Sequence, residues 1–296
     1  MNSGKKSDWQ PDFIGVGAER CATTWCWYCL NEHPEICVTH PKEVHYFDRN
    51  YDKGEKWYRL HFSCDNNQIM GEINPLYMYS PVAARRIAHD YPDTNILLIL
   101  RNPFERTMDR LFLDLQNVIG GIDNITLAQA KQLAKTKDDY LERSLYFKYL
   151  SPYFDYFDRE NIIILYYDDL KSDHRNFLSN LYRSLGADPY FIPPSADKAI
   201  NIAGNYRWPL LFFSLQKVSR TAKKYSVTNR LLEWVNRNLG IREWFFRVAT
   251  VNKGKPDFKF MEVFCEADRD LILQDLENLA QILKVRVPVS WINDIA

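Results

Sequence analysis

The chain has 296 residues, of which 46% are hydrophobic and 26% are charged, which is enough for one large α/β domain or two small ones. Lys and Arg number 38, and Asp and Glu also number 38, so the net charge is zero. A general nucleic-acid binder is basic overall, so this balance argues against nucleic acid as a partner.

Cysteine usage and the N-terminus suggest a location. Six cysteines in a chain of this length do not indicate a disulfide scaffold. The first ten residues are polar and lack the apolar core of a signal peptide, and no apolar run is long enough for a transmembrane helix. We therefore expect a cytoplasmic protein with reduced thiols.

Short apolar runs alternate with helical patterns along the chain. This alternation predicts an α/β fold in which helices flank a central parallel sheet. The predicted strands are 12–16, 35–39, 68–73, 95–100 and 161–167. The predicted helices are about 23–31, 81–90, a helix from Pro103, 172–185 ending at Gly186, and about 260–283 with Leu271, Leu276, Leu279 and Ile282 on its apolar face.

The segment 205–250 differs from this pattern. It is aromatic-rich and predicted to be helical, and we expect it to be an insertion within a single domain spanning 1–296. Residues 201–255 hold 11 Lys or Arg against 2 Asp or Glu, a local net charge of +9. Such a field attracts an anionic ligand or a membrane surface, although a solvated helical face would have the same composition.

The stretch 17–30, GAERCATTWCWYCL, supports two interpretations. Cys26 and Cys29 have the spacing of a redox pair, but they lie one to two turns inside an apolar helix, where a thiol is normally inert. The preceding GAERCATT has the layout of an anion site, with a strand, a tight turn and then a helix start. The N–H groups and dipole of a helix start favour a negative charge, and Arg20 can contact phosphate or sulfate in a bidentate manner.

A second cationic position follows the strand 95–100. That strand delivers Arg101 to its carboxyl end, where ligands bind in open parallel sheets. Asn102 and Pro103 then turn the chain into a helix that carries Arg106 one turn later. By itself, a surface arginine after a strand would explain this pattern as well.

Together these motifs resemble the sulfotransferases that use 3′-phosphoadenosine-5′-phosphosulfate (PAPS). GAERCATTW resembles the family's 5′-phosphosulfate loop, and LRNPFERTMD resembles its 3′-phosphate motif. The segments 33–62, 71–81, 141–170 and 251–255, with the final PVSWI, resemble further family elements in the same order. The resemblance spans nearly the whole chain and implies a P-loop-like fold.

The resemblance also implies roles for individual residues. Glu43 in KEVHYF would be the base that takes the acceptor proton, and His45 would orient the acceptor or share the proton transfer. Arg20 would stabilise the charge on the leaving nucleotide. The resemblance implies donor binding by Gly17, Arg20, Cys21, Ala22, Thr23, Thr24, Arg101, Asp109, Lys253, Gly254 and Lys255. The product nucleotide is PAP, no metal is implied, and the acceptor would be a small molecule, glycan or lipid.

Three positions depart from the family pattern. Ala22 replaces a Gly and is expected to be tolerated if its φ is negative. Asp109 stands where a Ser donates to the 3′-phosphate, and Ile73 where some glycan-modifying members have Lys. These departures keep a catalytically degenerate nucleotide-binding member as an alternative. A kinase-like phosphotransferase is disfavoured because the Lys-Ser/Thr pair of the nucleotide-triphosphate loop is missing.

Overall fold

The structure is a computed structural model that describes residues 9–65, 67–119, 125–136, 139–198, 205–206, 250–251, 256–283, 287–288 and 290–293. The chain forms two compact units. The first comprises Met1–Thr107, Leu141–Asn201 and Glu266–Ala296, and the second comprises Met108–Tyr140 and Ile202–Cys265. None of the described helices has the length and apolar character needed to cross a bilayer.

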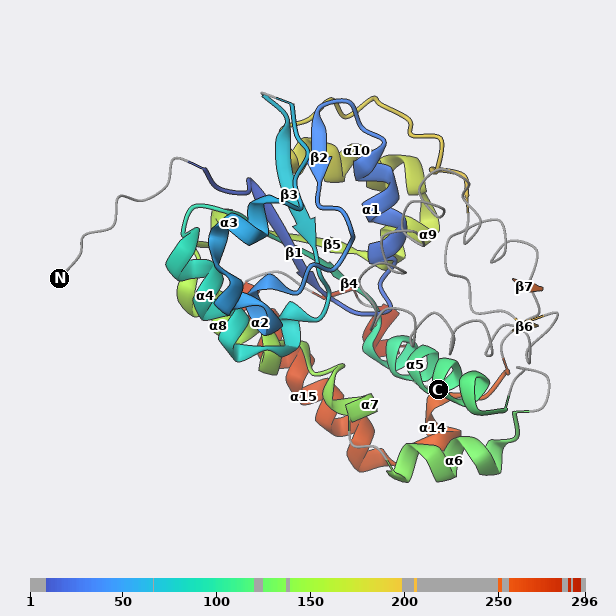
Figure 1. The fold of residues 1–296 in the computed structure, drawn as a ribbon. Coiled ribbons are helices and arrows are strands. Elements are labelled where there is room, and N and C mark those ends of the chain that lie inside the picture. The colour runs from blue at the N-terminus through green and yellow to red at the C-terminus, as the bar shows by residue number, and fades with distance from the viewer. Residues whose placement is uncertain are drawn as a thin grey trace, which may run out of the picture. The chain divides into compact units, whose positions relative to one another are not determined.

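A five-stranded parallel sheet forms the centre of the first unit (Figure 1). The strand order is β2-β3-β1-β4-β5, and every neighbouring pair is parallel, as predicted. The strands are β1 (Phe13–Gly17), β2 (Ile36–Val38), β3 (Ile69–Ile73), β4 (Asn95–Leu100) and β5 (Ile162–Tyr166). Strands β1 and β4 are buried almost throughout, which explains why their sequences are apolar without alternation.

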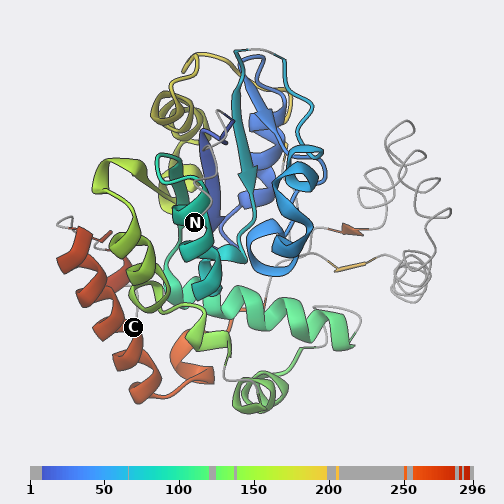
Figure 2. The same cartoon turned by 60° about the vertical axis from the view of Figure 1, so that its left-hand side comes forward.

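Helices cover both faces of this sheet (Figures 1 and 2). On one face, Tyr182 of α10 donates its hydroxyl to the carbonyl of Cys29 in α1 at 3.1 Å. On the other, Tyr153 of α8 donates to the carbonyl of Tyr77 at 2.9 Å. The first-face helices are α1 (Thr23–Asn31), α9 (Tyr167–Ser172) and α10 (His174–Leu185), and the second-face helices include α2 (Tyr46–Arg49), α3 (Gly54–Arg59), α4 (Pro81–Asp90) and α8 (Tyr146–Tyr156).

Local sequence rules set several helix ends. The Ser80 hydroxyl accepts the N–H of Ala83 and caps α4, and Pro81 occupies its first turn. Gly186 ends α10 in the left-handed conformation, with φ 83°, as predicted for a C-terminal glycine. This unit also contains the short helices η1 (Tyr51–Lys53), η2 (Tyr77–Tyr79), η3 (Arg159–Asn161) and α16 (Ser290–Asn293).

The C-terminal helix differs from its prediction. Instead of one helix over 260–283, the chain forms α14 (Phe260–Val263) and α15 (Glu266–Leu283). Leu276 and Leu279 are buried as expected, whereas Leu271 and Ile282 are 49% and 38% exposed. Their neighbours Ile272 and Leu283 are buried instead, because the face turned towards α8 is rotated by one residue.

The second unit contains the described part of the predicted insertion. Helix α6 (Leu127–Thr136) contacts α14, and α5 (Pro103–Ile119) and α7 (Asp139–Glu142) extend across the boundary between the units. Residues 205–206 and 250–251 form an antiparallel pair, β6 (Asn205–Tyr206) and β7 (Thr250–Val251), where a helix was expected. The pairing closes the two ends of the segment onto each other, and residues 207–249 lie outside the described residues.

One disulfide contradicts the expectation that all cysteines are reduced. Cys37 in β2 is bonded to Cys64 in the loop after α3. The sequence could not reveal this pair, because the two residues are 27 positions apart and meet only when β2 joins the sheet beside β3. Disulfides are typical of oxidising compartments. The cytoplasmic location stays a prediction.

Candidate functional site

The loop between β1 and α1 is held in a special backbone shape. Gly17 ends β1 beneath the buried Met78, and a Cβ on this glycine would lie 2.7 Å from the Met78 sulfur. The N–H of Ala18 donates to the carbonyl of Ile99 at 2.9 Å, which ties the loop to β4. Arg20 and Ala22 then adopt positive φ angles of 71° and 59°. The start of the loop is therefore held by Met78 on one side and by β4 on the other.

The start of α1 provides donors for an anion. The helix begins at Thr23, and its cap residue Ala22 gives no side-chain hydrogen bond to the N–H groups of the first turn. Thr23 is 7% exposed. The Nε of Arg20 is buried and has no hydrogen-bond partner within the described part of the chain. This geometry suits the phosphosulfate end of a nucleotide, whose oxygens accept such bonds.

Ala22 does not meet the condition under which its substitution for Gly was expected to be harmless. Its φ is 59°, in the left-handed region, rather than negative. A Cβ in this region is unfavourable by roughly 1–2 kcal/mol. The loop therefore keeps the glycine-type conformation although the residue is Ala, and the cost is borne by the rest of the fold.

The three cysteines of this stretch are not redox-active thiols. Cys21, Cys26 and Cys29 are fully buried. Burial raises the pKa of Cys21 to about 11 and of Cys29 to about 12, and it raises the pKa of Cys26 as well. A protonated buried thiol is a weak nucleophile. This contradicts the redox interpretation and leaves these cysteines as core residues, with Cys21 inside the loop.

Arg101 lies next to the same loop, as the strand order requires. Its Nη1 donates to the carbonyl of Arg20 at 3.4 Å, and its guanidinium lies 4.6 Å from the centre of the Tyr167 ring. Its Nε and Nη2 donate to Glu105 at 3.0 and 2.8 Å, and Lys171 contacts the same carboxylate at 3.1 Å. Burial tends to raise the pKa of Glu105, but Arg101 and Lys171 outweigh it and lower that pKa.

Arg106 is buried among the side chains between α5 and the segment before α8. It is fully buried, and its Nε donates to the Ser144 hydroxyl at 2.7 Å, which also contacts the Thr107 hydroxyl at 2.6 Å. These contacts connect α5 with the segment before α8.

The described structure does not test four of the proposed donor-binding residues. Asp109 is 6% exposed and belongs to the second unit. Lys253, Gly254 and Lys255 lie outside the described residues. The 3′-phosphate site therefore stays a prediction.

The loop after β2 carries Glu43 and His45. Glu43 forms an ion pair with Lys42, and its N–H donates to the carbonyl of Ile73 at 3.3 Å. Lys42 is close enough to Cys26 of α1 for its charge to act on that thiol. Glu43 and His45 have φ angles of 62° and 57°. Positive φ at such residues is rare and concentrates at functional sites.

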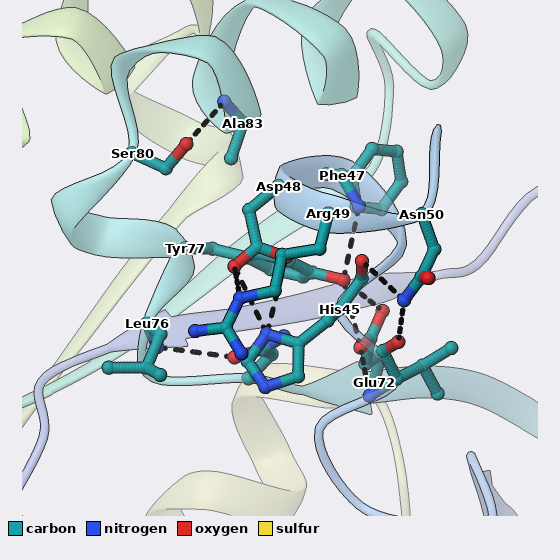
Figure 3. A network of polar contacts seen from close by, with 12 residues as sticks. His45, Phe47, Asp48, Arg49, Asn50, Glu72, Leu76, Tyr77, Ser80 and Ala83 are labelled. Carbon is teal, nitrogen blue, oxygen red and sulfur yellow. Dashed lines mark hydrogen bonds and ion pairs between the residues drawn. The ribbon is translucent and has the colours of Figure 1, made fainter. Parts of the chain in front are cut away.

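Asp48 is a site residue that the sequence analysis missed. Its carboxylate lies 3.0 Å from His45 Nδ1, and this contact orients the imidazole ring (Figure 3). Asn74 Nδ2 lies 3.2 Å from the same ring nitrogen. The three-residue spacing of His45 and Asp48 could have indicated this contact, because such residues share a helix face.

The loops that carry Arg20, Glu43, His45 and Arg101 lie at the carboxyl ends of the parallel strands. The loops after β1, β2 and β4, and Asn74 after β3, all follow the carboxyl end of a strand, where open α/β sheets bind ligands. Of the ranges that the structure describes, none contains three or more His, Cys, Asp or Glu side chains placed to hold a metal ion.

Known proteins resemble this chain in both sequence and fold. A family model described as "Sulfotransferase domain" matches residues 10–197. The "Membrane-associated sulfotransferase kil1" of Dictyostelium discoideum is 34% identical over 110 residues, which cover 36% of this chain and 23% of that protein. The "Heparan sulfate glucosamine 3-O-sulfotransferase 3B1" of Mus musculus is 28% identical over 188 residues, which cover 62% and 48%.

A solved structure extends the likeness to the fold. A sulfotransferase from Alicyclobacillus acidocaldarius matches 96% of this chain and 100% of its own, with a TM-score of 0.62 and 19% identity. At this identity the match supports the fold alone. The chain spans less than half the length of the two curated relatives.

Proposed function

Because the chain belongs to the sulfotransferase domain family, we propose that it transfers a sulfuryl group from PAPS to a hydroxyl or amine of a carbohydrate or glycolipid. The buried Arg20 Nε beside the uncapped start of α1 carries this proposal. A guanidinium donor without a partner is costly to bury, so a ligand oxygen there would satisfy it. The surrounding N–H groups would supply further donors.

The proposed reaction breaks one bond to sulfur and forms another. The acceptor oxygen or nitrogen attacks sulfur, and the bond between sulfur and the bridging phosphate oxygen breaks, leaving PAP. Glu43 takes the acceptor proton, with His45 held by Asp48 to orient the acceptor. Arg20, Thr23 and Thr24 stabilise the negative charge that develops on the leaving oxygen.

The names of the relatives support a glycan as the acceptor. Several of the relatives are heparan sulfate glucosamine 3-O-sulfotransferases, whose acceptor is a glycan hydroxyl. The chain carries Ile73 where some glycan-modifying members have Lys, so its acceptor contacts differ at this position. Transfer of labelled sulfate from PAPS to a panel that includes heparan sulfate, simple sugars and glycolipids tests the acceptor class.

Binding of the nucleotide tests the donor. Calorimetric titration with PAP should detect one site, and Arg20→Ala should weaken it. If neither PAP nor PAPS binds the purified protein, the proposed function is wrong.

A degenerate nucleotide-binding protein is the second candidate. The Arg101 guanidinium is engaged by Glu105, and Asp109 adds a carboxylate to the 3′-phosphate motif. Both features would weaken a 3′-phosphate contact. PAP binding without transfer to any acceptor of the panel would favour this candidate over the enzyme.

The basic segment 205–250 supports peripheral contact with a membrane surface. Each Lys or Arg near an anionic surface contributes about 1 kcal/mol, and salt screens this attraction. Binding to vesicles containing phosphatidylserine should therefore be strong at low salt and weak at high salt. Equal binding to neutral vesicles would contradict this proposal.

A further inference from the structure

Glu72 is a fully buried carboxylate in β3 that the proposed chemistry does not use. It is 0% exposed. Its Oε1 accepts the N–H of Val44 at 3.1 Å and the hydroxyl of Tyr77 at 3.0 Å, and its Oε2 accepts the hydroxyl of Tyr58 at 2.7 Å. All three partners are uncharged donors that converge on one carboxylate, and Figure 3 shows Glu72 beside Tyr77.

The same cluster reaches the other end of the segment 44–47. The N–H of Phe47 donates to the Tyr77 hydroxyl at 3.3 Å, and that hydroxyl donates in turn to Glu72. Asn50 Nδ2 donates to the carbonyls of Val44 and His45 at 3.1 and 3.2 Å. Side chains therefore fix the backbone of this segment at both ends.

This segment needs such support because its backbone is strained. Glu43 and His45, on either side of Val44, both have positive φ angles. A non-glycine residue in the left-handed region persists only when its surroundings over-determine it. The N–H of Val44 lies between the two strained residues. Its hydrogen bond to Glu72 therefore holds the backbone between Glu43 and His45.

We propose that Glu72 is a positioning residue whose buried carboxylate holds the backbone of 44–47 and thereby sets the positions of Glu43 and His45. This inference rests on the proposed function for its catalytic consequence, but the positioning itself does not depend on turnover. Ionised Glu72 accepts from all three donors, whereas a protonated carboxyl is itself a donor and must give up one of these bonds.

The chemistry of the cluster makes this positioning sensitive to pH. Burial raises the pKa of Glu72 to about 7, although hydrogen bonds from Tyr58 and Tyr77 and the nearby His45 act to lower it. Burial raises the pKa of both tyrosines well above the usual value, so they remain donors. Tyr91 is the further titratable group facing Tyr58. The segment should therefore be firm above pH 7 and looser below it.

Amide hydrogen exchange of Val44 and Phe47 tests the positioning directly. Charge-assisted hydrogen bonds are about twice as strong as neutral ones, so the protection factors should fall roughly tenfold between pH 8 and pH 6 in the wild type. In Glu72→Gln, protection at pH 8 should already be roughly tenfold lower and should not change with pH. Protection in Glu72→Gln equal to wild type at both pH values would overturn the proposal.

Two further variants separate Glu72 from its neighbours. His45→Asn removes the second titratable group, and Asn tolerates a positive φ. The fall in protection of Val44 and Phe47 between pH 8 and pH 6 must persist in this variant. If it disappeared, the pH dependence would belong to His45 and the proposal would be contradicted. Tyr91→Phe is a matched control, since Tyr91 is buried in the same aromatic cluster but donates to Glu55 at 3.2 Å rather than to Glu72. It should leave the protection of Val44 and Phe47 unchanged.

Transfer kinetics connect the positioning to the proposed function. With PAPS and heparan sulfate, kcat of Glu72→Gln should fall at least tenfold at pH 8 while KM for PAPS stays within about twofold. If the wild type transfers no sulfate, the proposed function fails, but the exchange measurements still decide on Glu72. If the wild type transfers sulfate and Glu72→Gln matches its kcat at every pH, the inference fails alone.

Discussion

Arg20 is the residue on which the proposed chemistry depends most. Its buried Nε lies beside the start of α1 and has no partner among the described side chains and backbone groups. Arg20→Ala should lower kcat for sulfuryl transfer by about 10²–10³-fold, because removing one preorganised donor to a developing oxyanion has this effect. Steady-state kinetics measure it. Arg85→Ala, which changes an exposed arginine on α4, is the control and should be neutral.

Ala22 tests whether the loop stores strain. Ala22→Gly should raise the free energy of unfolding by about 0.5–1 kcal/mol, because relief of the left-handed Cβ clash exceeds the added entropy of the unfolded chain. Urea denaturation gives the value. By contrast, Ala84→Gly, in the interior of α4, should lower it by about 1 kcal/mol or more. A lower free energy of unfolding in Ala22→Gly would contradict the inference that the backbone at Ala22 is strained.

At the level of elements, the disulfide fastens the edge strand β2 to the loop after α3. For a separation of 27 residues, the chain-entropy model gives roughly 3–4 kcal/mol of stabilisation. Cys37→Ser combined with Cys64→Ser should lower the free energy of unfolding by about this amount, as should reduction by dithiothreitol. Cys265→Ser, at an exposed thiol outside the disulfide, should not. Wild-type unfolding that is insensitive to reductant would refute the pairing.

The close approach of β1 and β3 depends on Gly71. A Cβ at this position would lie 2.2 Å from the ring of Phe13, which is fully buried in β1. Gly71→Ala should therefore destabilise the protein by about 1–3 kcal/mol through overpacking. Adding Phe13→Leu should recover part of this loss, and thermal unfolding of the single and double variants measures the coupling. If the effects of Gly71→Ala and Phe13→Leu on stability were strictly additive, the close contact between these two positions would be contradicted.

The pH dependence of stability belongs to the whole molecule. Glu72 keeps its proton up to a pKa of about 7 in the folded protein, against 4.5 in the unfolded chain. Folding takes up a proton between these values, so stability falls as the pH rises through this window. Relative to that of Glu72→Gln, the free energy of unfolding of the wild type should fall by roughly 3 kcal/mol between pH 4.5 and 7. Urea titrations of both proteins at both pH values measure this change. If the difference between their free energies of unfolding were the same at the two pH values, the raised pKa of Glu72 would be contradicted.

Much of the fold could be predicted because it depends on local features. The limits of α4 and β4 and the end of α10 agree with the predicted ranges, since Pro at a first turn, continuous apolar runs and Gly at a helix end act over a few residues. The prediction of the C-terminal helix was less accurate. Leu271 and Ile282 fit a helical period, but which side of the helix faces α8 depends on the partner and not on the period.

The candidate site divides in the same way. The sequence by itself determined the family. It also predicted the anion loop with Arg20, and Glu43 with His45, because these are short motifs whose residue types carry the chemistry. Only the tertiary structure decided that Cys37 meets Cys64 and that Glu72 holds the strained segment 44–47. Each of these contacts joins residues on different elements or sets a backbone angle against its local preference, so no short stretch of sequence contains it.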